Sequence, residues 1–99
     1  MAKRGKLEII QNILKIIQEN YNSIKPTPLL RQSNISSSRF KEYLSELTEK
    51  KFVKEVYNKG NKFISLTEKG LRFLEKYKTI VNFIDEFELW SIPMILFNS

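Results

Sequence analysis

Three consecutive serines followed by two basic residues form the stretch with the clearest chemical potential. Ser36, Ser37 and Ser38 precede Arg39 and Lys41. Serine favours the start of a helix, where free backbone N–H groups and a positive potential attract phosphate. Its hydroxyl adds a short donor, and an arginine can reach a phosphate or a guanine edge. The stretch therefore predicts a helix whose first turn meets nucleic acid; the alternative is a capped helix with a solvated surface.

Further basic and polar residues lie where they would add contacts to a phosphate backbone. These candidates are Arg31 and Gln32 before the serines, Lys59, Asn61 and Lys62 in a later turn, and Lys3, Arg4 and Lys6 in an N-terminal basic arm. Each set has an alternative interpretation as ordinary solvated surface, and turn lysines also guard strand edges. Glu42 would repel phosphate, unless it accepts from a cytosine amine or points sideways.

The balance of charge supports an acidic partner. The chain has 99 residues, with 17 Lys or Arg against 11 Asp or Glu, and its net charge is +6. Residues 21–66 carry +5 of this charge, whereas residues 67–99 carry −1. In one small domain, this balance favours nucleic acid as the partner before an anionic membrane.

The composition argues against catalysis, metal binding and membrane insertion. The chain has no histidine and no cysteine, so the serines lack the commonest activating base and no disulfide can form. We see no metal constellation and no glycine-rich phosphate loop. We therefore expect no enzyme activity, cofactor or small-molecule substrate. No apolar run reaches the roughly 18 residues of a membrane span, and the N-terminus is not a signal peptide, so we expect a cytoplasmic protein.

Helical periodicity and capping residues predict three helices in the first half. The first runs from about Lys6 to Glu19, with more than one face buried, on the spacing of Leu7, Ile9, Ile10, Ile13, Leu14, Ile16 and Ile17. A short second helix, capped by Thr27 with Pro28 at its first position, ends near Ser33. Asn34 suits a left-handed turn, and Ser36 or Ser37 caps the third helix. The inward side of the third helix is Phe40, Tyr43, Leu44 and Leu47.

The second half predicts a hairpin and a long helix. Residues 52–57 and 62–66 are rich in aromatic and β-branched types, with a turn signal at residues 58–61 between them. Thr67 caps a last helix from about Glu68 to Leu89.

The last helix carries a heptad seam of about two heptads, formed by Phe73, Tyr77, Ile80, Ile84 and Phe87. We expect this seam, with Trp90, to join two subunits, although an intrachain core is the alternative. Pro93 should break the helix at or before Ile92. The apolar tail, residues 90–97, has no Lys or Arg, so docking on a partner subunit or its own domain is favoured over a membrane surface.

The order of helix, helix, helix, strand, strand, helix is the winged helix-turn-helix layout, in which the third helix enters the major groove. The segment Phe63-Ile64-Ser65-Leu66-Thr67-Glu68-Lys69-Gly70 resembles the strand-to-helix junction of many prokaryotic winged-helix regulators. With residues 4–10 and Tyr43-Leu44, it resembles the small archaeal winged-helix chromatin proteins of the ten-kilodalton "a" class, over residues 3–88. That resemblance implies an antiparallel coiled-coil dimer that binds double-stranded DNA with little sequence preference.

The sequence therefore predicts a mainly α winged helix-turn-helix fold with a small β-hairpin. Residues 1–66 would form the DNA-binding domain, and residues 67–99 the dimerisation helix and apolar tail. We expect a homodimer that binds double-stranded DNA with low sequence specificity, either associated with the nucleoid or regulating transcription. The alternatives are a winged-helix protein-interaction module that leaves DNA alone, and a single-strand binder. The single-strand binder needs exposed aromatic residues, yet Phe40, Tyr43, Phe52 and Phe63 fit buried positions.

Overall fold

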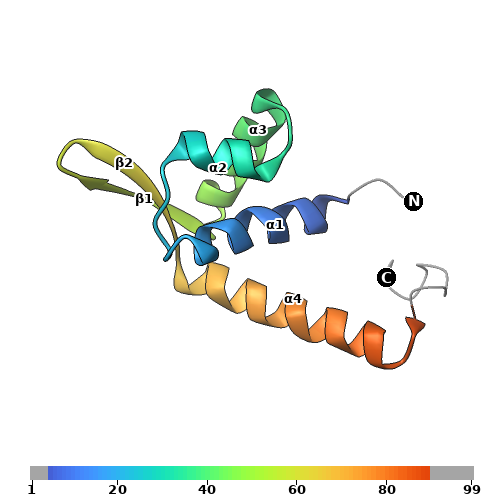
Figure 1. The fold of residues 1–99 in the computed structure, drawn as a ribbon. Coiled ribbons are helices and arrows are strands. Elements are labelled where there is room, and N and C mark those ends of the chain that lie inside the picture. Colours follow the sequence, from blue (N-terminus) through green and yellow to red (C-terminus); the bar gives the residue numbers. More distant parts are fainter. Residues whose placement is uncertain (1–4, 90–99) are drawn as a thin grey trace.

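The computed structural model describes residues 5–89, which form four helices and one hairpin in the predicted order (Figure 1). The elements are α1 (Lys6–Glu19), α2 (Pro26–Ser33), α3 (Ser37–Glu49), β1 (Val53–Asn58), β2 (Asn61–Leu66) and α4 (Glu68–Glu86). The predicted mainly α fold with a β-hairpin is therefore confirmed. The predictions for Lys3, Arg4, Trp90 and Pro93 lie outside the described residues. Within residues 5–89, no helix combines the length and apolarity that a membrane span requires.

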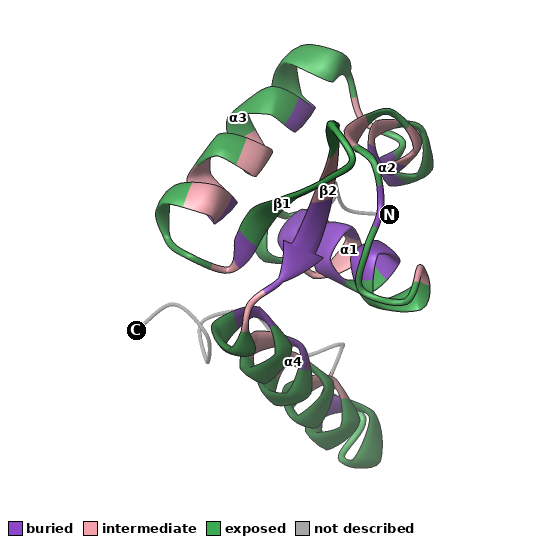
Figure 2. Ribbon diagram, turned by 90° about the vertical axis from the view of Figure 1, so that its left-hand side faces the viewer, coloured by how far each residue is buried: buried purple, intermediate pink, exposed green. Residues whose placement is uncertain are grey.

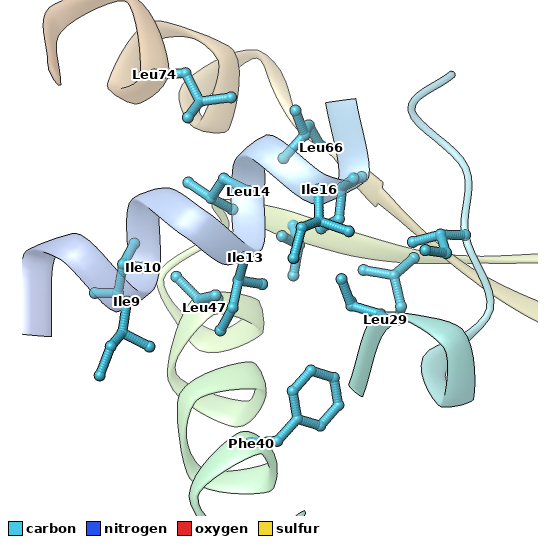
Figure 3. Packing of buried hydrophobic residues seen from close by; sticks show 14 residues of the cluster. Ile9, Ile10, Ile13, Leu14, Ile16, Leu29, Phe40, Leu47, Leu66 and Leu74 are labelled. Carbon is cyan, nitrogen blue, oxygen red and sulfur yellow. The ribbon is translucent and has the colours of Figure 1, made fainter. Parts of the chain in front are cut away.

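Helix α1 is the centre of the core, as its two apolar stripes predict. Six of its residues are buried: Ile9, Ile10, Ile13, Leu14, Ile16 and Ile17. Leu7 was predicted to join them but is 61% exposed, because it lies in the first turn, at the end of α1 that points away from the hairpin. Phe40 and Leu47 of α3 and Leu29 of α2 pack in the same cluster (Figure 3). Burial of this apolar surface fixes the side of α3 that faces inward.

The turn between α2 and α3 has the predicted conformation. Asn34 adopts the left-handed region, with φ 59° and ψ 40°, and Ile35 is half-buried beside it. The predicted start of α2 is wrong by two residues, because Lys25 is the N-cap and Pro26 occupies the first helical position. Proline is favoured there because its fixed φ suits a helix and its missing N–H needs no partner. Thr27 is thus inside the first turn.

The hairpin is antiparallel, and its strands are paired from Val53–Leu66 to Asn58–Asn61. Each strand lies within one residue of its predicted bounds. Lys59 and Gly60 form the two-residue turn, with φ of 52° and 81°, as expected for a type I′ hairpin. Strand β2 also forms a bridge between Ile24 and Ile64, in which the Ile64 N–H donates to the Ile24 carbonyl at 2.7 Å. Strand β2 is thereby paired on both of its edges, with β1 on one side and Ile24 on the other.

The junction between β2 and α4 is fastened to the end of α3. Thr67 caps α4 by accepting from the Gly70 N–H at 3.1 Å, as predicted. The Thr67 N–H donates to the Phe52 carbonyl at 3.1 Å, and the Thr67 hydroxyl donates to the Lys51 carbonyl at 2.5 Å. Lys69 Nζ donates to the Lys50 carbonyl at 2.9 Å. The geometry of this corner therefore depends on backbone carbonyls at the end of α3 and just after it, those of Lys50, Lys51 and Phe52.

Helix α4 leaves the body of the domain along its second half (Figure 1). It ends at Glu86, three residues before the predicted Leu89, because Glu88 takes a positive φ of 53°. Its first half packs on the domain, where the Phe73 ring meets Phe52 edge-on at 5.4 Å between centroids and stacks on Tyr77 at 6.0 Å. The predicted seam is therefore divided into two parts. Phe73 and Tyr77 are half-buried on their own domain, whereas Ile80 and Phe87 are exposed.

Candidate nucleic-acid interface

The face of α3 opposite the core is a stripe of neutral and acidic residues. Ser38, Glu42, Ser45 and Glu49, here called the outer stripe, are spaced by four, three and four residues, and all are exposed. Phe40 points the opposite way, into the core, so the outer stripe faces solvent along the whole helix (Figures 2 and 3). A helix with one free face of this kind has the shape that fits a major groove.

Two cations flank the outer stripe, one on each side. Arg39 lines a hollow of about 280 Å³ with Lys6 of α1 and with Glu42, and its guanidinium carbon lies 5.9 Å from the centre of the Tyr43 ring. Lys41 lines a different hollow, together with Glu55 of β1. Arg39 therefore lies on the α1 side of the stripe, whereas Lys41 lies on the hairpin side.

The start of α3 offers backbone donors as predicted. The Ser36 side chain is the N-cap and accepts from the Arg39 N–H at 3.3 Å, while its hydroxyl lies 3.4 Å from that of Ser38. The first residues of a helix have no intrahelical partner for their N–H groups. The amides of Ser37 and Ser38 are therefore at the open, positive end of the helix dipole, where an anion is favoured.

The remaining predicted residues lie on α2 and on the hairpin. Arg31 and Gln32 are exposed in the last turn of α2, and Gln32 accepts from the Asn20 amide at 3.5 Å. Lys59 and Asn61 are exposed at the hairpin turn. Lys62 is less free, because its Nζ lies 3.4 Å from a carboxylate oxygen of Glu55. None of the ion pairs between residues 5 and 89 includes Lys59, which leaves this turn residue available to an external anion.

A family model describes this arrangement of helices and hairpin. The model of the winged helix-turn-helix family matches residues 3–85. The chain belongs to the winged helix-turn-helix family. The hairpin β1–β2 is the wing of this fold, and α3 occupies the position of the second helix of the helix-turn-helix.

Solved structures share this winged-helix fold. Sso10a-2, a DNA-binding protein from Sulfolobus solfataricus, superposes with a TM-score of 0.70 at 19% identity, over 86% of each chain. F-93 of SSV1 has a TM-score of 0.62 at 25% identity, covering 86% of this chain and 99% of that one. F93 from STIV, a winged-helix DNA-binding protein, has a TM-score of 0.63 at 21% identity, covering 92% and 97%. The resemblance to small archaeal winged-helix proteins is thus confirmed. A search of curated protein sequences found no match.

Lys6 was predicted to belong to a basic arm that contacts DNA, but it forms an ion pair within the domain. It is the first residue of α1, and its Nζ lies 2.9 Å from Glu46 of α3, which Lys50 also meets at 3.0 Å. The hydrogen bond to Glu46 raises the pKa of Lys6, and hydrogen bonds from Lys6 and then Lys50 lower the pKa of Glu46. The pairing of Glu46 with Lys50 was readable from their spacing of four residues, but the contact with Lys6 was not.

We predict that Lys6→Gln raises the pKa of Glu46 toward its ordinary value of 4.5 more than Lys50→Gln does, because Lys6 is the larger cause of the shift. A lowered folded-state pKa means that the pair stabilises the fold above the unfolded-state pKa, and that this contribution is lost as the pH falls through the folded-state pKa. Carboxyl NMR titration of wild type and both variants measures this. Equal Glu46 titration curves in all three proteins would contradict the ion pair between Lys6 and Glu46.

In the part of the winged helix that the structure describes, no group of three or more Asp or Glu residues is placed to hold a metal ion. The candidate site contains helix-end amides, hydroxyls, the two flanking cations Arg39 and Lys41, and the wing residue Lys59.

Proposed function

We propose that this protein binds double-stranded DNA as a homodimer, with α3 in the major groove and the wing beside the adjacent backbone. The observation that carries the proposal is the position of Arg39 and Lys41 on opposite sides of the outer stripe. A helix inserted in the groove has a phosphate strand on each side, so each cation meets a different strand. The open N-terminus of α3 supplies further donors to phosphate.

The charge distribution and the relatives support this proposal. Residues 21–66, which contain α3 and the wing, carry +5 of the net charge of +6. Sso10a-2 and F93 from STIV are both described as DNA-binding proteins. Phosphate contacts supply most of the affinity in this proposal, so discrimination between sequences is modest. Such a dimer serves either in organising the nucleoid or at promoters.

Arg39→Ala combined with Lys41→Ala tests the groove contact. In a dimer the two changes remove four phosphate contacts, so we expect affinity for a random 30-base-pair duplex to fall by about 100-fold at low salt. The slope of log affinity against log salt should become shallower by about 3 to 4. Fluorescence anisotropy at several salt concentrations measures both quantities.

Lys15→Ala with Lys76→Ala is the matched control, because it removes two exposed cations from α1 and α4 instead of α3. This control should change affinity by less than about threefold. If Arg39→Ala with Lys41→Ala binds duplex as well as wild type, α3 does not enter the groove. The protein-interaction alternative would then be favoured.

We infer that the second half of α4 joins the two subunits. Ile80, Phe83 and Phe87 form an exposed apolar group, here called the α4 patch, with 51%, 51% and 55% of each residue accessible. The rings of Phe83 and Phe87 lie 4.9 Å apart. Apolar side chains grouped in this way on a projecting helix are typical of an interface. Phe83 was absent from the predicted seam, whereas the seam residue Ile84 is buried at 7% exposure.

The charges of α4 support an antiparallel pair of these helices. Residues 68–78 contain four basic and two acidic residues, whereas residues 79–89 contain three acidic residues and no basic one. This order opposes the helix dipole, which favours acidic residues at the start and basic residues at the end. In an antiparallel pair, the acidic half of each α4 lies beside the basic half of its partner. This order of charges, which is unfavourable within one helix, therefore becomes attractive between two antiparallel helices.

A further inference from the structure

The outer stripe of α3 presents an unpaired carboxylate at its centre. Glu42 lines both the hollow on the Arg39 side and a second one with Lys41 and Ser45, so it lies between the two flanking cations. None of the ion pairs among residues 5–89 includes Glu42. Glu46, one turn later, is already neutralised by Lys6 and Lys50. Glu42 therefore differs from its acidic neighbour in having no cation of its own.

We propose that Glu42 is a specificity-determining residue that accepts a hydrogen bond from the N4 amine of cytosine in the major groove. The proposal rests on the proposed function, because it requires α3 to lie in the groove. With Arg39 and Lys41 directed at the two phosphate strands, the outer stripe between them faces the base edges. Of its residues, Ser38 and Ser45 tolerate either a donor or an acceptor, whereas the carboxylates of Glu42 and Glu49 only accept. Of these two, Glu42 is the one that shares a hollow with Arg39 as well as with Lys41, so it is the one that we expect to read a base between the two cations.

The choice of cytosine follows from the pattern of groups in the groove. Cytosine presents the N4 amine as a donor, and this is the base that acidic side chains read. Thymine offers the O4 acceptor and guanine offers two acceptors, and all of these repel a carboxylate. Adenine presents an amine beside the N7 acceptor, which also opposes the second carboxylate oxygen. A wrong base thus leaves Glu42 without a partner in a negative environment, and this penalty creates selectivity.

Selection from a duplex pool with a random central segment tests the proposal. Wild type should enrich sites that contain a cytosine at one fixed position of each half-site. Replacing that C·G pair by T·A should weaken binding by about tenfold, because the amine becomes a carbonyl acceptor. Glu42→Gln should bind both duplexes within about twofold of each other, and should bind random duplex more tightly than wild type by about two- to fivefold.

Glu49→Gln is the matched control, since it removes the same charge from the same stripe two turns further along α3. It should keep the wild-type preference for cytosine. The proposal is overturned if wild type enriches no cytosine position, or if Glu42→Gln enriches the same position as wild type. Either result leaves the proposed function intact as long as Arg39→Ala with Lys41→Ala still weakens duplex binding. A wild-type protein that binds no duplex would overturn both.

Discussion

Gly70→Ala is expected to destabilise the fold by about 2 to 4 kcal/mol, a large part of the roughly 5 to 15 kcal/mol that holds a domain together. A Cβ at this position would meet the carbonyl oxygen of Phe52 at 2.3 Å. That oxygen is backbone, and it already accepts from the N–H of Thr67, so moving it would break this bond at the start of α4. Alanine is intrinsically about 1 kcal/mol better than glycine in a helix, so the clash must exceed this gain.

Thermal and urea denaturation followed by circular dichroism measure this effect. A loss of this size corresponds to a fall in Tm of about 10 to 25 °C for a chain of this length. Gly5→Ala is the control, because a Cβ there meets nothing within 4 Å. Gly60→Ala has equal space but a φ of +81°, so it should cost only about 1 kcal/mol of backbone strain. A Gly70→Ala protein as stable as Gly5→Ala would show that the close approach to Phe52 does not exist.

Ile80→Glu with Phe83→Glu is expected to convert the proposed dimer into monomers, with an association constant at least about 100-fold weaker. The change places four carboxylates in the proposed apolar contact, where they lose hydration and repel one another. Because both residues are half-exposed in the isolated fold, the monomer itself should remain folded. Ile84 is unsuitable for this test, since it is only 7% exposed in the isolated chain and does not belong to the accessible α4 patch. Sedimentation velocity measures the association state, and a thermal melt verifies the fold.

Thr79→Glu with Asn82→Glu adds the same two charges to exposed polar positions in the same turns of α4, and it should stay dimeric. The patch variant should also lose DNA affinity by about 10-fold or more, because two linked α3 helices bind as one unit. A dimer that persists in Ile80→Glu with Phe83→Glu places the interface elsewhere. The groove of about 520 Å³ between α1 and α4, lined by Tyr77 and Val81, would be the next surface to test.

Local sequence determined the elements and most of their ends. Asn34, Ser36 and Thr67 were readable as turn and capping residues because their effects act within a few positions along the chain. The two-residue turn Lys59-Gly60 follows from the same local chemistry. The start of α2 was misplaced by two residues, since Pro26 and Pro28 both suit a first turn and local preference alone does not choose between them.

Only the tertiary structure decided which residues face each other across elements. The ion pair of Lys6 with Glu46 joins residues 40 positions apart, and the close approach of Gly70 to Phe52 depends on how α4 meets the end of α3. The outer stripe, with Arg39 and Lys41 on opposite sides, required knowing that α1 and the wing lie beside α3. Periodicity identifies an apolar face, but packing decides how much of that face the domain covers. On α4 the domain partly covers Phe73 and Tyr77, and it leaves the α4 patch exposed.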